Sequence, residues 1–298
     1  MPGTGLNGHR PVGATVPTGW RDALNPPVYL VSILPGLGVP LLAGGPVVHA
    51  SGLVLATVAV VLLQHAINLF NDAADWRLGA DVEKHDSWVR VHHERPQIAV
   101  LHGAISLLTG GMLGLGILWQ QGQWWIVAIA APMLGLGYLY NAGSRPLSYT
   151  HLGEWVTGIC YGPGVFGCLW LVAGQPPGAA MLAGMTAFAA LAVALLLSHQ
   201  PPQIETDRQA GKLSFAVRYG AARTRTVAWW LFVLFLLATA GALLLASPAA
   251  GILPAGLGVL LGYRLRTTML NPKRLLLSAS AFILLGLLAD TVSSAMVP

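Results

Sequence analysis

The sequence contains little charge for its length. Asp, Glu, Lys and Arg together make up 9% of its 298 residues, whereas a typical soluble domain contains roughly 25%. Hydrophobic residues account for 55%, and the mean hydropathy is +0.65. A soluble fold of this composition would need an implausibly large core. We therefore expect an all-α integral membrane protein, because no strand-like alternation of apolar and polar residues is sustained.

Cysteine and targeting signals are also scarce. The two cysteines, Cys160 and Cys168, lie in one apolar segment, about 12 Å apart along a helix axis, which is too far for a disulfide. Residues 1–26 lack the compact apolar core and cleavage site of a secretory signal. We expect them to form a short cytoplasmic segment, followed by one transmembrane domain over residues 27–298.

Long apolar runs dominate the rest of the chain. A membrane-spanning helix needs about 20 mostly apolar residues. The sequence predicts nine such helices, with an uncertain eighth, at residues 27–48, 51–70, 98–118, 123–141, 153–174, 178–199, 226–246, 250–263 and 275–296.

The basic residues support this count and predict an orientation. All sixteen Lys and Arg residues fall in the N-terminal segment or in residues 72–97, 142–152, 200–225 and 264–274. With nine spans, these segments share one side of the membrane, whereas a wrong count would scatter them. Excess Lys and Arg in short loops marks the cytoplasmic side. We therefore expect a cytoplasmic N-terminus and an external C-terminus in the cytoplasmic (inner) membrane.

The first long loop begins with a cluster of oxygen-bearing side chains. Asn68, Asn71, Asp72 and Asp75 recur at spacings of three and four, so they share one face if the second helix continues to Asp75. Clustered carboxylates repel each other unless a cation lies among them. Mg²⁺ takes hard oxygen ligands and usually keeps waters and phosphate oxygens. The alternative, a solvated acidic helix end, is less consistent with the apolar run that precedes the cluster.

A second long loop combines acids and bases. Glu205 and Asp207 are followed by Arg208 and Lys212 at i, i+4 spacing, with Gly211 beside them. Carboxylates that hold a metal, with Arg or Lys to neutralise remaining charge, are what a metal-bound diphosphate requires. The two loops together predict a diphosphate site at the cytoplasmic face.

The two motifs together resemble a known family. The pattern Asn-Asp-x-x-Asp-x-x-x-Gly-x-Asp at residues 71–81 and Asp-Arg-x-x-Gly-Lys-x-Ser at 207–214 is similar to the UbiA superfamily of intramembrane prenyltransferases. The most similar branch prenylates 1,4-dihydroxy-2-naphthoate in menaquinone synthesis. The segment 145–154 also resembles a loop of that branch.

The resemblance implies nine helices around a central cavity, in which Mg²⁺ and two acidic motifs bind a prenyl diphosphate and an aromatic acceptor attacks the allylic cation. It implies a lipid bilayer and no nucleic acid as further partners. The metal ligands it implies are Asn71, Asp72, Asp75, Asp81 and Asp207. The catalytic residues are Asp72, Asp75, Asp207, Arg145 and Lys212. The substrate-binding residues are Asn68, Asn71, Arg77, Tyr140, Gln200, Gln203 and Arg208.

The sequence departs from the family pattern at three places. Gln203 stands where the second motif has its first Asp. The middle-loop Tyr-x-x-x-Lys is reduced to Tyr140 followed by Ser144, and Arg145 is a candidate substitute for the lost Lys. His199 and Gln200 stand where Asn-Asn or Asn-Gln is usual.

Three alternatives to this interpretation remain. A membrane terpene cyclase of the same superfamily would ionise the diphosphate without an acceptor. A transporter or lipid-binding protein is disfavoured because the charge gathers at one face. A zinc site around His85, His92 and His93 fits no familiar ligand spacing. His93 and Arg95 are instead candidates for contact with substrate.

Five tryptophans lie near the ends of predicted spans. They fit either an aromatic belt at the membrane interface or the aromatic walls of a cavity. They are Trp124, Trp125, Trp155, Trp229 and Trp230.

Overall fold

A computed structural model describes residues 19–79, 84, 86–246, 248–267 and 271–296, and all regular elements within these ranges are helical. Thirteen α-helices follow in chain order: α1 (Trp20–Leu24), α2 (Leu30–Ala43), α3 (Ala50–Leu78), α4 (Trp88–Val91), α5 (Pro96–Gln121), α6 (Val127–Asn141), α7 (Gly153–Ile159), α8 (Cys168–Val172), α9 (Ala179–His199), α10 (Ile204–Gln209), α11 (Phe215–Ala246), α12 (Pro248–Thr267) and α13 (Pro272–Met296). Four short 3₁₀ turns are η1 (Pro26–Tyr29), η2 (Trp124–Ile126), η3 (Leu147–Tyr149) and η5 (Pro201–Gln203), and a π-helical segment is η4 (Cys160–Gly167).

Eight helical segments of the described chain are long and apolar enough to cross a membrane. They are Trp20–Ala43, Ala50–Leu78, Pro96–Gln121, Trp124–Asn141, Gly153–Val172, Ala179–Gln209, Phe215–Leu245 and Pro272–Ser293. The expected eighth span, 250–263, lies inside the 20-residue helix α12, which is not among these eight. An integral membrane protein with all-helical spans is thus confirmed, and a ninth crossing stays a prediction.

Proline shapes the expected fifth span. Residues 153–172 form one continuous helical segment made of α7, η4 and α8, and Pro163 lies in its π-helical part, η4. Proline has no backbone N–H to donate, so a wide turn at this position avoids part of the conflict that a proline creates in a regular α-helix.

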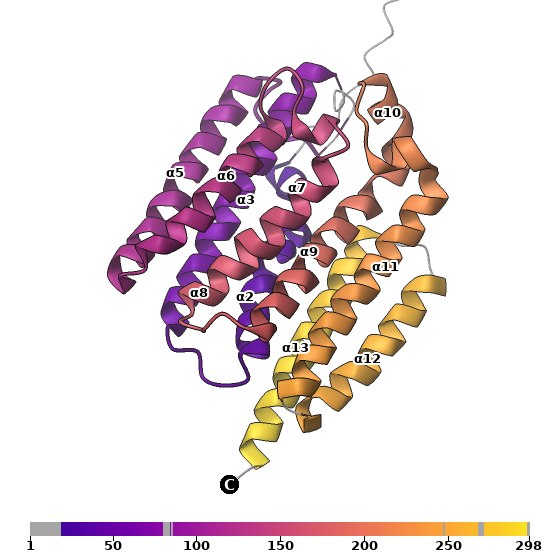
Figure 1. The fold of residues 1–298 in the computed structure, drawn as a ribbon. Coiled ribbons are helices and arrows are strands. Elements are labelled where there is room, and N and C mark those ends of the chain that lie inside the picture. Colours follow the sequence, from indigo (N-terminus) through magenta and orange to yellow (C-terminus); the bar gives the residue numbers. More distant parts are fainter. Residues whose placement is uncertain (1–18, 80–83, 85, 247, 268–270, 297–298) are drawn as a thin grey trace, which may run out of the picture.

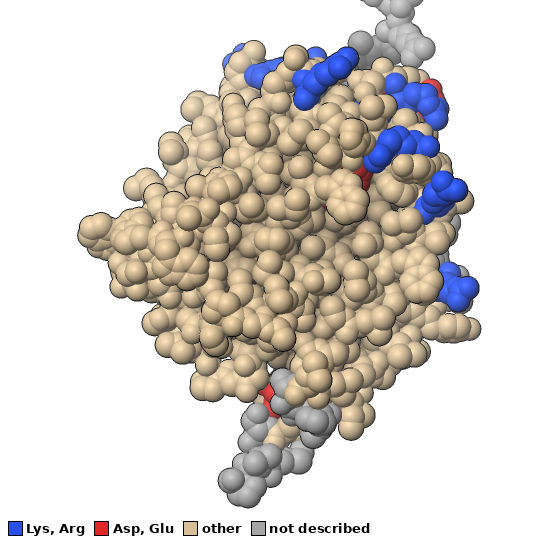
Figure 2. All heavy atoms as spheres, in the orientation of Figure 1, with Lys and Arg blue, Asp and Glu red and all other residues tan. Residues whose placement is uncertain are grey.

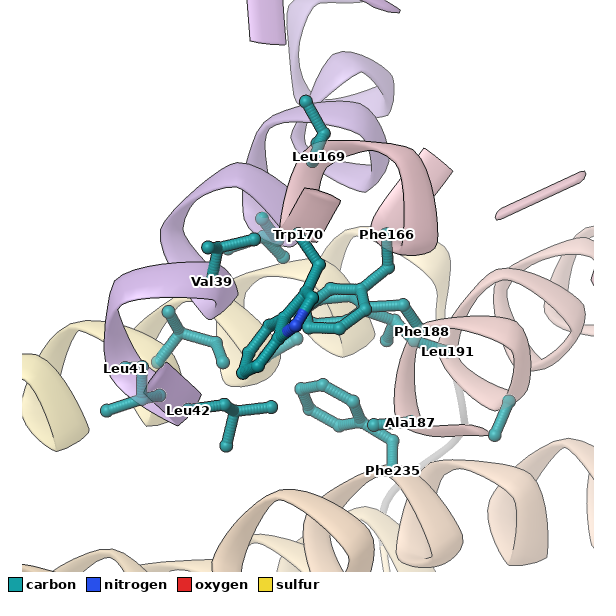
Figure 3. Packing of buried hydrophobic residues seen from close by; sticks show 14 of the residues in the cluster. Val39, Leu41, Leu42, Phe166, Leu169, Trp170, Ala187, Phe188, Leu191 and Phe235 are labelled. Atoms are coloured by element: carbon teal, nitrogen blue, oxygen red, sulfur yellow. The ribbon is translucent and has the colours of Figure 1, made fainter. Parts of the chain in front are cut away.

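The helices run along one another as a bundle (Figure 1). Its largest apolar cluster lies where α2, η4, α8, α9 and α11 meet, and Figure 3 shows the rings of Phe166, Phe188 and Phe235 from three of these elements converging. The Phe166 and Phe188 rings stack at 5.1 Å between centroids. A Cβ on Gly184 would overlap the Phe166 ring, so a glycine is needed for this close approach.

Charge is distributed unevenly over the surface. Figure 2 shows Lys and Arg side chains at the upper end and along the adjoining edge, whereas a broad area of the same face carries none. The short helix α10, which carries the second acidic motif, lies at this upper end in Figure 1. The second of the two long polar loops therefore lies at the charged end.

Candidate functional site

A cavity of about 380 Å³ lies at the charged end of the bundle, bounded by α3, α9 and the segment from Gln200 to Ser214. Its lining includes most of the side chains that the sequence predicted: Asn68, Asn71, Asp72, Asp75, Tyr140, Gln200, Gln203, Asp207 and Lys212. Two motifs that are far apart in sequence thus contribute to one site.

The first motif reaches the cavity because α3 continues to Leu78, beyond the apolar run that ends at residue 70. Asn68, Asp72 and Asp75 are three and four residues apart on this one helix, so their side chains share a face. Gly79, with φ 83°, then ends the helix in a left-handed conformation that favours glycine.

Asp72 is almost fully buried, with 5% of its surface exposed. The ammonium of Lys84 donates to its Oδ1 at 2.9 Å, and the backbone N–H of Trp88 donates to its Oδ2 at 2.7 Å. These donors come from the segment after α3, so the loop folds back over the motif. Both contacts hold the Asp72 carboxylate in place against the segment that follows α3.

Asp75 is even more enclosed, with 2% of its surface exposed. The Tyr149 hydroxyl donates to Oδ1 at 2.8 Å. The Asn71 amide and the Lys212 ammonium donate to Oδ2 at 3.0 and 3.2 Å. Lys212 also lies over the Tyr149 ring, 5.1 Å from its centroid. Asp75 is therefore the residue through which the first motif, the middle loop and the second motif meet.

Asp207 is held by its own loop. The hydroxyl of Ser214 donates to its Oδ2 at 2.7 Å. The Lys212 N–H donates to the Asp207 carbonyl at 2.8 Å, across a turn in which Gly211 has φ 74°. This closed turn brings the lysine side chain towards the cavity.

Glu154 was not predicted, although it lies in the loop segment that carried part of the resemblance. It lines the cavity, and its carboxylate accepts from the Gln200 amide at 3.2 Å, the Phe215 N–H at 2.7 Å and Arg218 at 3.2 Å. Gln200 in turn accepts from the Ala216 N–H at 3.1 Å. Because the first N–H groups of a helix have no partner within it, these two side chains anchor the start of α11.

Other predicted residues lie elsewhere. Arg77, Arg145 and Arg208 are not among the residues lining the cavity. Arg77 lines a separate pocket beside α5 and α6, Arg145 is exposed, and Arg208 forms a surface ion pair with Glu205 at 2.9 Å. Asp81 lies outside the described residues. Among the described residues, the Lys and Arg side chains that line the cavity are those of Lys84 and Lys212.

The histidines form a separate cluster. His65 and His102 approach at 3.3 Å between their Nε2 atoms, and His92 Nε2 approaches His102 Nδ1 at 3.2 Å. His102 presents its two ring nitrogens to different partners, so the three rings do not converge on one point. In the described part of the chain, no three His, Cys, Asp or Glu side chains lie close enough together to hold a metal ion by themselves. Burial and the neighbouring His102 and His93 rings lower the pKa of His92.

The aromatic side chains of the cavity are Trp88 and Tyr140, not the tryptophans at span ends. Trp124, Trp125, Trp155 and Trp230 are exposed, as expected of an interfacial belt. Trp229 is partly buried and donates to the Gly262 carbonyl at 2.9 Å. His93 and Arg95 are exposed and do not line the cavity.

The cavity fits Mg²⁺ better than a softer metal. Its buried acids are Asp72, Asp75, Glu154 and Asp207, which provide oxygen donors. Its lining includes one histidine, His199, and neither Cys160 nor Cys168. Mg²⁺ is commonly bound through one or two carboxylates together with waters and substrate phosphates, without a complete cage of protein ligands. Oxygen donors in the lining of one cavity are consistent with that mode of binding.

Comparison with known proteins agrees with this arrangement. A sequence profile of the UbiA prenyltransferase family matches residues 30–288. The 2-carboxy-1,4-naphthoquinone phytyltransferase of Synechocystis is 28% identical over 211 residues, which cover 67% of this chain and 66% of that protein. The 1,4-dihydroxy-2-naphthoate octaprenyltransferase of Mycobacterium tuberculosis is 31% identical over 175 residues, which cover 57% and 59%. The matches span about three fifths to two thirds of the relatives' length.

Solved structures share the fold of this chain. A structure of a UbiA homolog from Archaeoglobus fulgidus bound to DMAPP and Mg²⁺ superposes with a TM-score of 0.63 at 15% identity, over 91% of this chain and 99% of that one. A digeranylgeranylglyceryl phosphate synthase structure gives a TM-score of 0.53 at 18% identity. With the profile match over most of its length and this shared fold, the chain belongs to the UbiA prenyltransferase family.

Proposed function

We propose that this protein transfers a prenyl group from a prenyl diphosphate to an aromatic quinone precursor such as dihydroxynaphthoate, with Mg²⁺ as its cofactor. The observation that carries the proposal is the convergence of Asp72, Asp75, Asp207 and Lys212 on one cavity. A site that joins buried carboxylates to ammonium groups can hold a metal and a phosphate side by side. The names of the two naphthoate-prenylating relatives support the class of acceptor.

The metal-holding residues in this proposal are Asn71, Asp72, Asp75, Asp81 and Asp207. Bound Mg²⁺ would supply a positive charge that stabilises the leaving diphosphate. Tyr149 and Ser214 orient the carboxylates of Asp75 and Asp207 through hydrogen bonds of 2.8 and 2.7 Å. Such partners hold metal ligands in place and tune the strength of binding.

Lys84 and Lys212 are the cations available to the diphosphate within the cavity lining. The allylic C–O bond breaks with its electron pair leaving on the diphosphate, and donors aimed at this growing charge stabilise the transition state. The faces of Trp88 and Tyr140 can stabilise the allylic cation. A ring carbon of the acceptor then forms the new C–C bond, and the ring releases a proton.

The further substrate-binding residues proposed are Asn68, Gln200 and Gln203, which line the cavity, and Arg77, Arg145 and Arg208 from its surroundings. The topology proposed is nine membrane crossings around the cavity in one domain over residues 27–298. In this topology the N-terminus and the long loops lie on the cytoplasmic side of the inner (cytoplasmic) membrane of the cell, and the C-terminus lies outside. This arrangement opens the diphosphate site to the cytoplasm.

Product analysis tests the proposal. Purified protein is incubated with a panel of prenyl diphosphates, with and without dihydroxynaphthoate, in Mg²⁺ or EDTA, and products are identified by mass spectrometry. We expect a prenylated naphthoate that requires both acceptor and Mg²⁺. A cyclic hydrocarbon released without acceptor would establish a terpene cyclase instead.

Matched variants link the activity to the cavity. Asp72→Asn and Asp207→Asn remove buried carboxylates and should lower turnover by about 10²-fold or more, as loss of one electrostatic contact does in other active sites. Glu205→Gln is the control, because Glu205 is an exposed acid of the same loop outside the cavity lining. Equal losses in all three variants would argue against the proposed site.

A further inference from the structure

A second hollow, of about 610 Å³, lies on the outer side of the bundle between α7, η4, α9 and α11. Residues along it are exposed, including Trp155 at 71%, Leu182 at 63% and Leu234 at 41%. We call it the lateral groove. Apart from one end and Thr186, its lining is apolar, and the helices that form it belong to the spans expected to face lipid.

The length of the lateral groove suits one lipid chain. Its lining on α9 extends from Leu182 to Leu197, a distance of about 22 Å at the helical rise per residue. One leaflet of a bilayer has a hydrocarbon depth of about 15 Å, half of the full core. The groove is therefore long enough to hold an acyl chain along one leaflet and to reach the depth of the lipid headgroup.

The polar end of the groove carries an excess of positive charge. Arg218 pairs with Glu154 at 3.2 Å and lies over the Tyr219 ring, 5.2 Å from its centroid. Arg223 lies over the same ring at 5.8 Å. The Nε of Arg218 is buried and has no hydrogen-bond partner among the residues that the structure describes. Two arginines against one carboxylate leave a single net positive charge at this end.

A glycine creates this end of the groove. Gly220 has φ 79° and ψ 162°, a non-helical conformation inside α11, and such a conformation is essentially restricted to glycine. The break separates the first turn of α11, which carries Arg218 and Tyr219, from the long apolar part of the helix. Tyr219 and Trp155 at the rim are the aromatic residues typical of a membrane interface.

We propose that the lateral groove binds one anionic phospholipid, with its phosphate at Arg218 and Arg223 and an acyl chain along α9. The phosphodiester of such a lipid carries one negative charge, which matches the single net positive charge at the polar end of the groove. A zwitterionic lipid has no net charge, so its electrostatic attraction to this end of the groove is weaker. A prenyl diphosphate carries more charge and suits the metal-binding carboxylates of the cavity, whereas Glu154 is already held by Arg218, Gln200 and the Phe215 N–H.

Native mass spectrometry of the full chain tests this site. The protein is ejected from nanodiscs made of equal amounts of phosphatidylcholine and phosphatidylglycerol, and the lipid retained on it is identified. We expect wild-type protein to retain one phosphatidylglycerol in preference to phosphatidylcholine. Arg223→Gln should reduce that preference about fivefold, the effect of roughly one basic residue near an anionic lipid surface.

A second variant blocks the apolar part. Thr186 is an exposed residue of the groove lining whose hydroxyl donates to Leu182 O at 2.9 Å, and Thr186→Phe should remove the retained lipid by filling the groove. Thr109→Phe is its control, because Thr109 is exposed on α5 with the same i−4 bond, at 2.9 Å to Ile105. Arg266→Gln is the control for Arg223→Gln, since Arg266 is exposed and lies 5.6 Å from the Trp229 ring outside the groove. Both controls should retain phosphatidylglycerol as wild type does.

Three results would overturn the inference. The first is equal retention of the two phospholipids by wild-type protein. The second is equal loss of phosphatidylglycerol in the control variants. The third is displacement of the retained lipid by geranyl diphosphate without Mg²⁺, which would assign the groove to the prenyl substrate. None of these readouts depends on turnover, so the proposed activity and the lipid site are tested separately.

Discussion

The ammonium of Lys212 lies 3.2 Å from Oδ2 of Asp75 and connects residues that are 137 positions apart in the sequence. This contact joins the two acidic motifs directly, and it places a cation on the carboxylate that is the least exposed in the cavity. Buried charge pairs of this kind are costly to break, because the remaining partner stays unpaired in a poorly solvated site.

Replacing Lys212 tests whether this cation serves the diphosphate. Lys212→Gln should lower kcat/KM for the prenyl diphosphate by about 10²-fold, since one preorganised contact to developing charge is removed. The measurement is a steady-state assay across diphosphate concentrations. Arg225→Gln removes an exposed basic residue outside the cavity lining, and it should change kcat/KM far less. A loss of similar size in both variants would contradict a specific role for Lys212.

The hydroxyl of Tyr149 supports Asp75 with a 2.8 Å hydrogen bond. Tyr149→Phe should lower the free energy of unfolding by about 1.5–3 kcal/mol, typical of a hydrogen bond to a charged group, and it should raise the Mg²⁺ concentration needed for half-maximal turnover. Thermal unfolding in detergent and a Mg²⁺ titration measure the two effects. Tyr138→Phe, at a side chain that is 58% exposed, should change neither quantity.

Gln203 offers a gain-of-function test. It lines the cavity and is the N-cap residue of α10, where Asp is a preferred residue. Gln203→Asp should lower the Mg²⁺ concentration for half-maximal turnover, on the order of tenfold if the new carboxylate acts as a metal partner. Gln209→Glu adds the same charge at an exposed position outside the cavity and should leave the Mg²⁺ titration unchanged. An unchanged titration for Gln203→Asp would show that this position does not contribute to metal binding.

Two glycines of α11 provide a matched pair for the helix break. A Cβ would meet nothing within 4 Å at either Gly220 or Gly241, so steric contact does not distinguish them. Gly220→Ala should lower the free energy of unfolding by about 1–3 kcal/mol, because the backbone of an alanine is strained at φ 79°. Gly241→Ala, in the regular part of the helix, should be neutral or slightly stabilising. Thermal unfolding of both variants decides this, and equal melting temperatures would contradict the strained conformation at Gly220.

Much of the fold was predictable from local sequence. The apolar runs predicted the membrane-spanning helices, because length and hydropathy alone determine whether a helix can cross a bilayer. The face shared by Asn68, Asp72 and Asp75 was predictable because helical spacing is local once α3 is known to continue to Leu78. The eighth span was the least certain prediction, and its helix α12 contains Arg264 and Arg266 in the last turn.

The sequence by itself determined a helical membrane protein with its oxygen ligands and cations gathered in a few loops. Only the tertiary structure decided which cations reach the cavity: Lys84 and Lys212 do, whereas Arg77, Arg145 and Arg208 do not line it. It also revealed Tyr149 and Glu154 as the residues that hold Asp75 and the start of α11. The physical reason is that helical spacing places neighbours on one face, but the meeting of distant loops depends on how the whole bundle packs.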